Sequence, residues 1–156
     1  AQRCGLMDKA QALGWFVVKG AGMDSLDCLA TLIGSPSAES RVFVMSGDQR
    51  ALGFLAPHVD VVLRGDEGCT EWDEETFLRT YGFAPSGFWI YLALAHVCTE
   101  ERARGLMPEV DIVCSDPLDD FPLRLLADRH GLDLASALRA LAFLGPVLPD
   151  GWGARR

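Results

Sequence analysis

The chain has 156 residues, of which 49% are hydrophobic and 23% charged, a composition typical of a folded protein with one core. Fourteen basic residues against 22 acidic ones give a formal net charge of −8. This sign excludes broad electrostatic attraction to the phosphate backbone of nucleic acids. The longest apolar run, Phe88–Ala95, is too short to cross a bilayer, so we expect no membrane insertion.

Cysteine and histidine usage argues against disulfides and zinc. The five cysteines are odd in number and widely spaced, which predicts free thiols in a reducing intracellular compartment. The three histidines have no partner at metal-ligand spacing. The first residue is not Met and the chain is rich in Ala, Leu and Arg, which is compatible with an imported protein whose presequence was removed. We therefore expect a location in the mitochondrial matrix or the cytoplasm.

The first part of the chain alternates predicted helices and strands. Apolar residues at three-to-four-residue intervals predict a helix over Gln2–Leu13. Short β-branched and aromatic runs predict three strands, Trp15–Val18, Arg41–Met45 and Val59–Leu63. Asp24 or Ser25 is placed to cap the helix between the first two strands, and Ser46 or Asp48 to cap a helix reaching about Ala56.

The second part of the chain predicts helices only. Asp73 or Thr70 can cap a helix over Glu74–Tyr81, with Gly82 after its end. Further helices are predicted at Gly87–Val97, Thr99–Leu106, Pro122–His130 and Leu134–Phe143. We therefore predict an α/β core over residues 1–68, built as a three-layer parallel sheet flanked by helices. A helical region over 69–145 and a tail over 146–156 complete the predicted chain.

Three carboxylates are expected to meet beyond the carboxyl ends of the predicted parallel strands. Asp24 and Asp27 lie three residues apart at a helix start, and Asp48 follows the next strand. Converging carboxylates can hold Mg²⁺, which takes oxygen ligands. The same residues can instead be helix N-caps, because Asp accepts hydrogen bonds from free amide groups at a helix start. Both interpretations stay open at this point.

Two blocks of sequence resemble a known family. Residues 22–32 read Gly-Met-Asp-Ser-Leu-Asp-Cys-Leu-Ala-Thr-Leu, and residues 42–55 read Val-Phe-Val-Met-Ser-Gly-Asp-Gln-Arg-Ala-Leu-Gly-Phe-Leu. They are similar to the Gly-x-Glu-Ala-Asp-Asp and Val-Thr-Gly-Asp-Lys-Asp-Leu-x-Gln-Leu blocks of the 5′-nuclease family, which includes flap endonucleases and the 5′–3′ exonuclease domain of bacterial DNA polymerase I. The resemblance covers Lys9 to Leu94 and implies a PIN-like fold with a two-metal site for phosphodiester cleavage.

Departures from the family pattern fall on its metal ligands. Asp24 stands where the family has Glu, whereas Asp27 and Asp48 keep acids. Leu26 and Arg50 replace two further acids, and the family's acidic block after the position of Leu94 is absent. An added guanidinium weakens the negative field that concentrates Mg²⁺ or Mn²⁺. We therefore expect no bound metal, and Arg50 paired with one or more of the three acids.

The resemblance and its departures together lead to three functional expectations. The first is a catalytically degenerate nuclease-like domain acting as a structural or interaction subunit of a larger assembly, with a ribonucleoprotein as one candidate and with no small-molecule substrate. It would contact protein through aromatic residues, unless these form the core: Trp72, Phe83, Phe88, Trp89 and Trp152.

The alternatives are an enzyme and a nucleic-acid binder. The enzyme would be a 5′–3′ exonuclease or flap endonuclease acting on DNA or RNA, with Mg²⁺ or Mn²⁺ held by Asp24, Asp27 and Asp48. The binder would contact RNA or DNA through arginines, with Arg50, Arg124 and Arg129 as candidates and Arg102, Arg104 and Arg139 on other helix surfaces. Such arginines also occur on solvated helix faces that bind nothing.

Overall fold

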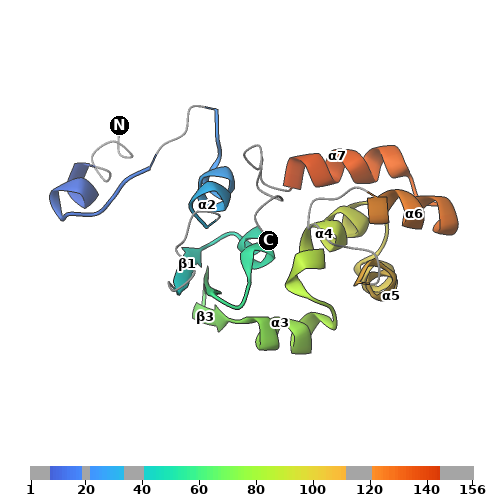
Figure 1. The fold of residues 1–156 in the computed structure, drawn as a ribbon, viewed down its shortest axis with the longest axis horizontal. Coiled ribbons are helices and arrows are strands. Elements are labelled where there is room, and N and C mark those ends of the chain that lie inside the picture. The colour runs from blue at the N-terminus through green and yellow to red at the C-terminus, as the bar shows by residue number, and fades with distance from the viewer. Residues whose placement is uncertain (1–7, 19–21, 34–40, 112–120, 145–156) are drawn as a thin grey trace.

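A three-stranded mixed sheet forms one side of the protein. The computed structural model describes residues 8–18, 22–33, 41–111 and 121–144. Strands β1 (Val42–Ser46), β2 (Val59–Gly65) and β3 (Gly68–Trp72) lie in the order β1-β2-β3. β1 runs parallel to β2, and β2 runs antiparallel to β3 (Figure 1). The predicted strands at Arg41–Met45 and Val59–Leu63 are thus confirmed.

The structure contains a strand, β3, that the sequence analysis did not predict. Gly65 pairs with Gly68, so only residues 66 and 67 form the turn between β2 and β3. Gly68 has a φ of 131°, a conformation that side chains with a Cβ rarely adopt. A two-residue turn with glycine reverses the chain tightly, and this feature of the Gly-Asp-Glu-Gly sequence indicates a hairpin.

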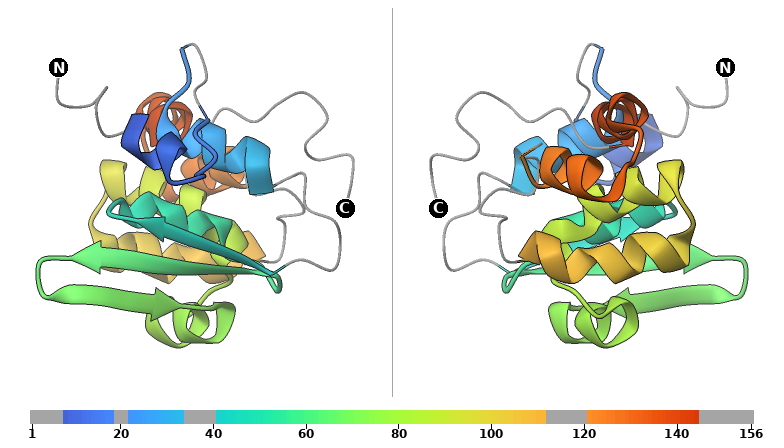
Figure 2. Two further views of the ribbon diagram at one scale, coloured as in Figure 1. Left: turned by 90° about the vertical axis from the view of Figure 1, so that its left-hand side faces the viewer. Right: turned by 90° about the vertical axis from the view of Figure 1, so that its right-hand side faces the viewer.

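The predicted three-layer parallel sheet is wrong. The sheet has one parallel and one antiparallel pair, and the strands lie in front of helices α4 and α5 in the left view of Figure 2. Val44 is buried on the covered face of β1, whereas Phe43 and Met45 are exposed on the other face. The described part of the chain therefore has the sheet covered by helices on one face.

The predicted strand at Trp15–Val18 is also wrong. These residues belong to neither a helix nor a strand, and three of the four side chains are exposed. A strand needs a neighbouring strand for its hydrogen bonds, and β propensity mainly measures how well a side chain fits a half-buried pleated surface. The apolar pattern of Trp15–Val18 shows that these side chains suit a strand. It does not show whether a neighbouring strand is available, and none of the described strands pairs with these residues.

The described helices follow the predicted order. They are α2 (Ser25–Ile33), the 3₁₀ helix η1 (Gln49–Phe54), α3 (Glu74–Tyr81), the 3₁₀ helix η2 (Pro85–Gly87), α4 (Phe88–Val97), α5 (Glu100–Asp111), α6 (Phe121–His130) and α7 (Leu134–Leu144). α3 has both predicted bounds, because the Asp73 side chain accepts from Thr76 N at 2.7 Å and Gly82 takes a φ of 81°.

Other helix bounds differ from the prediction or lie outside the described residues. α5 continues past Leu106 and contains Pro108. Proline has no amide hydrogen, so the carbonyl of Arg104 lacks its helical hydrogen bond. Arg104 is exposed, so water can bind this carbonyl instead. Residues 8–12 are helical, whereas residues 2–7 of the predicted first helix and the predicted tail lie outside the described ranges.

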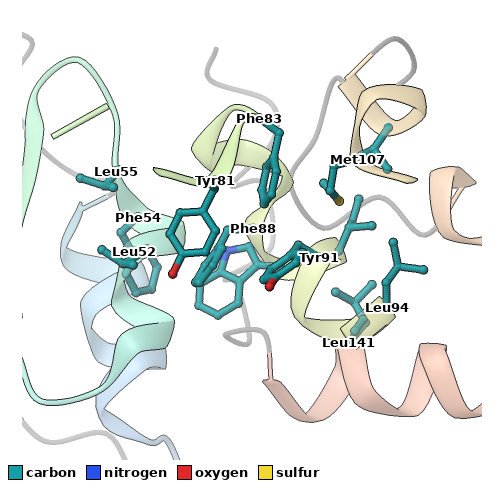
Figure 3. Close-up of a cluster of buried hydrophobic side chains, with 14 of the residues drawn as sticks. Leu52, Phe54, Leu55, Tyr81, Phe83, Phe88, Tyr91, Leu94, Met107 and Leu141 are labelled. Carbon is teal, nitrogen blue, oxygen red and sulfur yellow. The ribbon is translucent and has the colours of Figure 1, made fainter. Parts of the chain in front are cut away.

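Helix α4 is the centre of the hydrophobic core. Six of its ten side chains are buried, and it packs against η1, η2, α5 and α7. Figure 3 shows four aromatic rings at the centre of this core, Tyr81, Phe83, Phe88 and Tyr91. Leu52, Phe54 and Leu55, from η1 and the residue after it, lie on one side, and Leu94, Met107 and Leu141, from α4, α5 and α7, lie on the other.

The aromatic residues considered for protein contacts are mostly in this core. Phe83, Phe88 and Trp89 are almost fully buried, and Trp72 is partly buried. Phe88 stacks on Tyr91 with ring centroids 5.9 Å apart, and Trp89 meets Phe54 edge to face at 5.6 Å. The prediction that Phe88 and Trp89 belong to the core is confirmed, while Trp152 lies outside the described residues.

Gly53 is required by the way η1 packs on α4. A Cβ at Gly53 would overlap the indole ring of Trp89, which is fixed in the core. We expect Gly53→Ala to lower the free energy of unfolding by about 1 to 3 kcal/mol, the usual cost of overpacking. Urea denaturation followed by tryptophan fluorescence measures this loss.

Gly105→Ala is the matched control, because Gly105 lies exposed in α5 with open space around the position of a Cβ. It should leave stability unchanged or raise it by about 0.5 to 1 kcal/mol through helix propensity. Equal effects of the two substitutions would contradict the packing of Gly53 against Trp89.

Candidate functional site

Asp24 and Asp27 form a reciprocal cap at the start of α2. Asp24 Oδ1 accepts from Leu26 N at 2.7 Å and from Asp27 N at 2.9 Å. In return, Asp27 Oδ2 accepts from Asp24 N at 2.9 Å. This is the hydrogen-bond pattern of a capping box, with Asp in place of Glu at the third helical position. Both carboxylates therefore satisfy backbone amides of the first turn, and Asp27 is buried there.

Asp48 caps η1 and binds Arg50 with both carboxylate oxygens. Its Oδ1 accepts from Arg50 N at 2.9 Å, and Asp48 N donates to Ser46 Oγ at 3.0 Å. The guanidinium of Arg50 donates from Nε and from Nη2 to Asp48 Oδ2 at 2.9 and 2.7 Å, and from Nε to Oδ1 at 3.1 Å. Such bidentate pairs are among the stronger charge-assisted hydrogen bonds in proteins.

The charges of all three acids act on Arg50. The pKa of Arg50 is raised, first by its hydrogen bond to Asp48 and further by the charges of Asp48, Asp24 and Asp27, while partial burial opposes the rise. Arg50 therefore contacts Asp48 and lies in the field of Asp24 and Asp27. We call this group of four residues, Asp24, Asp27, Asp48 and Arg50, the acidic cluster.

The pair also makes Asp48 a stronger acid. The hydrogen bond from Arg50 lowers the pKa of Asp48 below its ordinary value of 3.8, against a smaller opposing effect of burial. Because the folded pKa is the lower one, the stabilisation is fully present above pH 3.8 and is lost as the pH falls through the folded pKa. Asp48 thus stays ionised and paired at neutral pH.

The oxygens of the acidic cluster accept hydrogen bonds from backbone amides and from a guanidinium. Within the described ranges, no group of three or more His, Cys, Asp or Glu side chains is arranged to hold a metal ion. A divalent cation at Asp48 would compete with the guanidinium, which keeps its proton throughout the physiological pH range.

The other candidate arginines lie on helix α6, away from the acidic cluster. Arg129 donates from Nη1 to Glu109 Oε2 at 2.7 Å, which joins α6 to α5, and His130 Nε2 lies 3.0 Å from Glu109 Oε1. The pKa of Glu109 is lowered, chiefly by Arg129. Arg124 is exposed on α6 and has interactions of its own. The structure therefore does not gather Arg50, Arg124 and Arg129 into one basic patch.

A second ion pair, which the sequence analysis did not predict, lies on the sheet. Asp60 is buried in β2 and accepts from Arg41 Nε at 2.6 Å, and the Arg41 guanidinium lies 5.6 Å from the centre of the Phe43 ring. A charged residue within the run Val59-Asp60-Val61-Val62 was the available signal, because a buried carboxylate in an apolar strand requires a partner.

Comparison of the chain with protein-family models, with curated proteins and with solved structures finds no match. None of the helices in the described ranges combines the length and the apolar character needed to cross a bilayer. The assignment of a function therefore rests on the geometry of the acidic cluster and on the resemblance read from the sequence.

The capping role of Asp24 predicts that its hydrogen-bonding atom matters more than its charge. Asp24→Ala removes the acceptor for two amides and should lower the free energy of unfolding by about 1 kcal/mol. Asp24→Asn keeps an acceptor oxygen and should retain most of that stability. Thermal and urea denaturation of the two variants measure the difference, and an equally large loss in both would show that the charge of Asp24, rather than the cap, supports the fold.

Proposed function

We propose that this protein is a catalytically degenerate 5′-nuclease-like domain that serves as a structural or interaction subunit of a larger, ribonucleoprotein-type assembly. The observation that carries the proposal is the bidentate pair of Arg50 with Asp48, in the field of Asp24 and Asp27. At these positions the sequence resembles a family whose acids hold metal ions. In this chain the acids cap helices and neutralise a guanidinium.

The guanidinium of Arg50 weakens the attraction of the acidic cluster for a catalytic cation. Three carboxylates and one guanidinium give the cluster a formal charge of −2, compared with −3 without Arg50. A divalent cation about 4 Å from the guanidinium would be repelled by about 2 kcal/mol in bulk water and by about 8 kcal/mol at an effective dielectric constant of about 20. Two-metal catalysis needs two such cations on the acids.

The charge of the whole chain favours protein partners over direct nucleic-acid contact. The formal net charge of −8 repels a phosphate backbone, and Arg129 is already paired with Glu109. Within an assembly that contains RNA, this subunit would therefore contact protein chains. The exposed apolar side chains of the sheet and of residues 13–18 supply surface for such contacts.

A cleavage assay separates this proposal from the enzyme. We expect no Mn²⁺-dependent hydrolysis of labelled 5′-flap DNA or of single-stranded RNA by the wild-type chain. Asp48→Asn keeps an oxygen that can cap η1 but removes the charge that a metal would need. Asp73→Asn makes the same change at the cap of α3, outside the acidic cluster, and serves as the matched control.

Hydrolysis by the wild-type chain that persists in Asp73→Asn and disappears in Asp48→Asn would contradict the proposal and establish the nuclease. Binding of the same substrates, measured at 50 and 200 mM salt, tests the remaining alternative. Tight binding that weakens steeply with salt would show direct phosphate contacts and a nucleic-acid-binding protein instead of a scaffold.

A further inference from the structure

The hairpin of β2 and β3 leaves one edge of the sheet open. β3 is an edge strand among the described strands, and residues 64–71 of the hairpin are all exposed. Residues 41–111, which contain the whole hairpin and the helices that follow it, are described without a gap. In both views of Figure 2 the turn of the hairpin projects beyond the helices. A projecting strand with a free edge can accept another strand as its neighbour.

The register shows which backbone groups are free along this edge. The residue pair that closes a two-residue turn exchanges hydrogen bonds, and bonded pairs then alternate along an antiparallel ladder. Thr70 and Trp72 therefore bond to β2. The N–H and C=O groups of Cys69 and Glu71 point the other way, towards the open edge, and both residues are exposed.

The same part of the chain is strongly acidic. We call residues 66–75, which cover the turn, β3 and the start of α3, the acidic edge. Six of these ten residues are acidic and none is basic: Asp66, Glu67, Glu71, Asp73, Glu74 and Glu75. Arg64 before the acidic edge and Arg79 after it offset only two of these charges.

These charges decide which strand can pair with β3. Like charges directly opposite each other in a strand pair are destabilising, whereas opposite charges stabilise the pair. A second copy of β3 would place acids beside acids, so self-pairing is disfavoured. Glu71 pairs with Val62, which pairs with Met45, so the Glu71 side chain stands on the uncovered face of the sheet. A neighbouring strand with alternating Lys or Arg places positive charges beside it there.

We propose that β3 is a docking edge for a basic, extended segment of a partner protein, which adds to the sheet as a further strand. Backbone hydrogen bonds to Cys69 and Glu71 hold the segment, and its Lys or Arg side chains pair with the acids of the acidic edge. The proposal rests on the proposed function, because it names the partner surface of the interaction subunit. A free edge alone does not select a partner, and the charges of the acidic edge make that selection.

A short peptide that alternates Lys and Val, blocked at both ends, is the probe. Fluorescence anisotropy of the labelled peptide should show saturable binding to the full chain, and this binding should weaken as salt is raised. Two control peptides carry N-methyl groups either on Lys or on Val, which removes amide donors and keeps every charge. A strand uses one of its two edges for β3, so one control should bind about tenfold more weakly than the other.

Charge reversal on β3 tests the acids. Glu71→Lys should weaken peptide binding by about two- to thirtyfold, because an attractive cross-strand pair becomes a repulsive one. Glu100→Lys is the matched control, since it makes the same change in net charge at an exposed position of α5. Its peptide binding should stay close to that of the wild-type chain. Both substitutions fall on exposed side chains, so the circular dichroism spectrum should not change.

Hydrogen exchange of backbone amides tests the pairing itself. In the free chain the amides of Cys69 and Glu71 should exchange fast and those of Thr70 and Trp72 slowly. Bound peptide should slow the exchange at Cys69 and Glu71.

The proposal is overturned by any of five results. These are no saturable peptide binding, equal binding of the two N-methylated peptides, equal losses in Glu71→Lys and Glu100→Lys, unchanged exchange at Cys69 and Glu71, and a wild-type dimer in which both amides are already protected. Each of them removes the docking edge alone. The proposed function falls only with Mn²⁺-dependent hydrolysis in the cleavage assay, so the two failures are distinguishable.

Discussion

The bidentate contact between Arg50 and Asp48 sets the charge and the hydrogen bonding of the acidic cluster. It places a permanent positive charge beside Asp48, in the field of Asp24 and Asp27. The three carboxylates also cap the starts of α2 and η1. A metal ion would therefore need the same oxygen atoms that now accept hydrogen bonds from the backbone and from Arg50. Asp24 accepts from two backbone amides, and Asp48 accepts from one amide and a guanidinium, so few of their lone pairs are left for a cation.

The hydrophobic core includes none of the acids of the acidic cluster. Helix α4 packs against η1, α5 and α7, and its rings of Phe88, Trp89 and Tyr91 contact one another and Phe54 of η1. The sheet in turn is covered on one face only, which leaves Phe43 and Met45 open. Exposed apolar side chains also lie on residues 13–18, α2, α3 and α7.

Local features of this fold were predictable and long-range features were not. The bounds of α3 followed from Asp73 and Gly82, because a cap and a left-handed glycine act within one turn. The pairing of Arg50 with the acids followed from charge alone, and the structure shows it with Asp48. The strand at Trp15–Val18 was predicted from side-chain type, yet a strand exists only where a neighbour accepts its hydrogen bonds. β3 was missed because its residues are mostly exposed and polar, although the sequence before it is typical of a two-residue hairpin turn.

The most direct test of the account is a calorimetric titration of Mn²⁺ into the wild-type chain and into Arg50→Gln at neutral pH. The account predicts no saturable binding to the wild-type chain, because the guanidinium already neutralises Asp48. Removal of the charge in Arg50→Gln should allow weak binding to the three acids, which the further substitution Asp48→Asn should abolish. Tight, saturable binding of two Mn²⁺ ions to the wild-type chain would contradict the central claim.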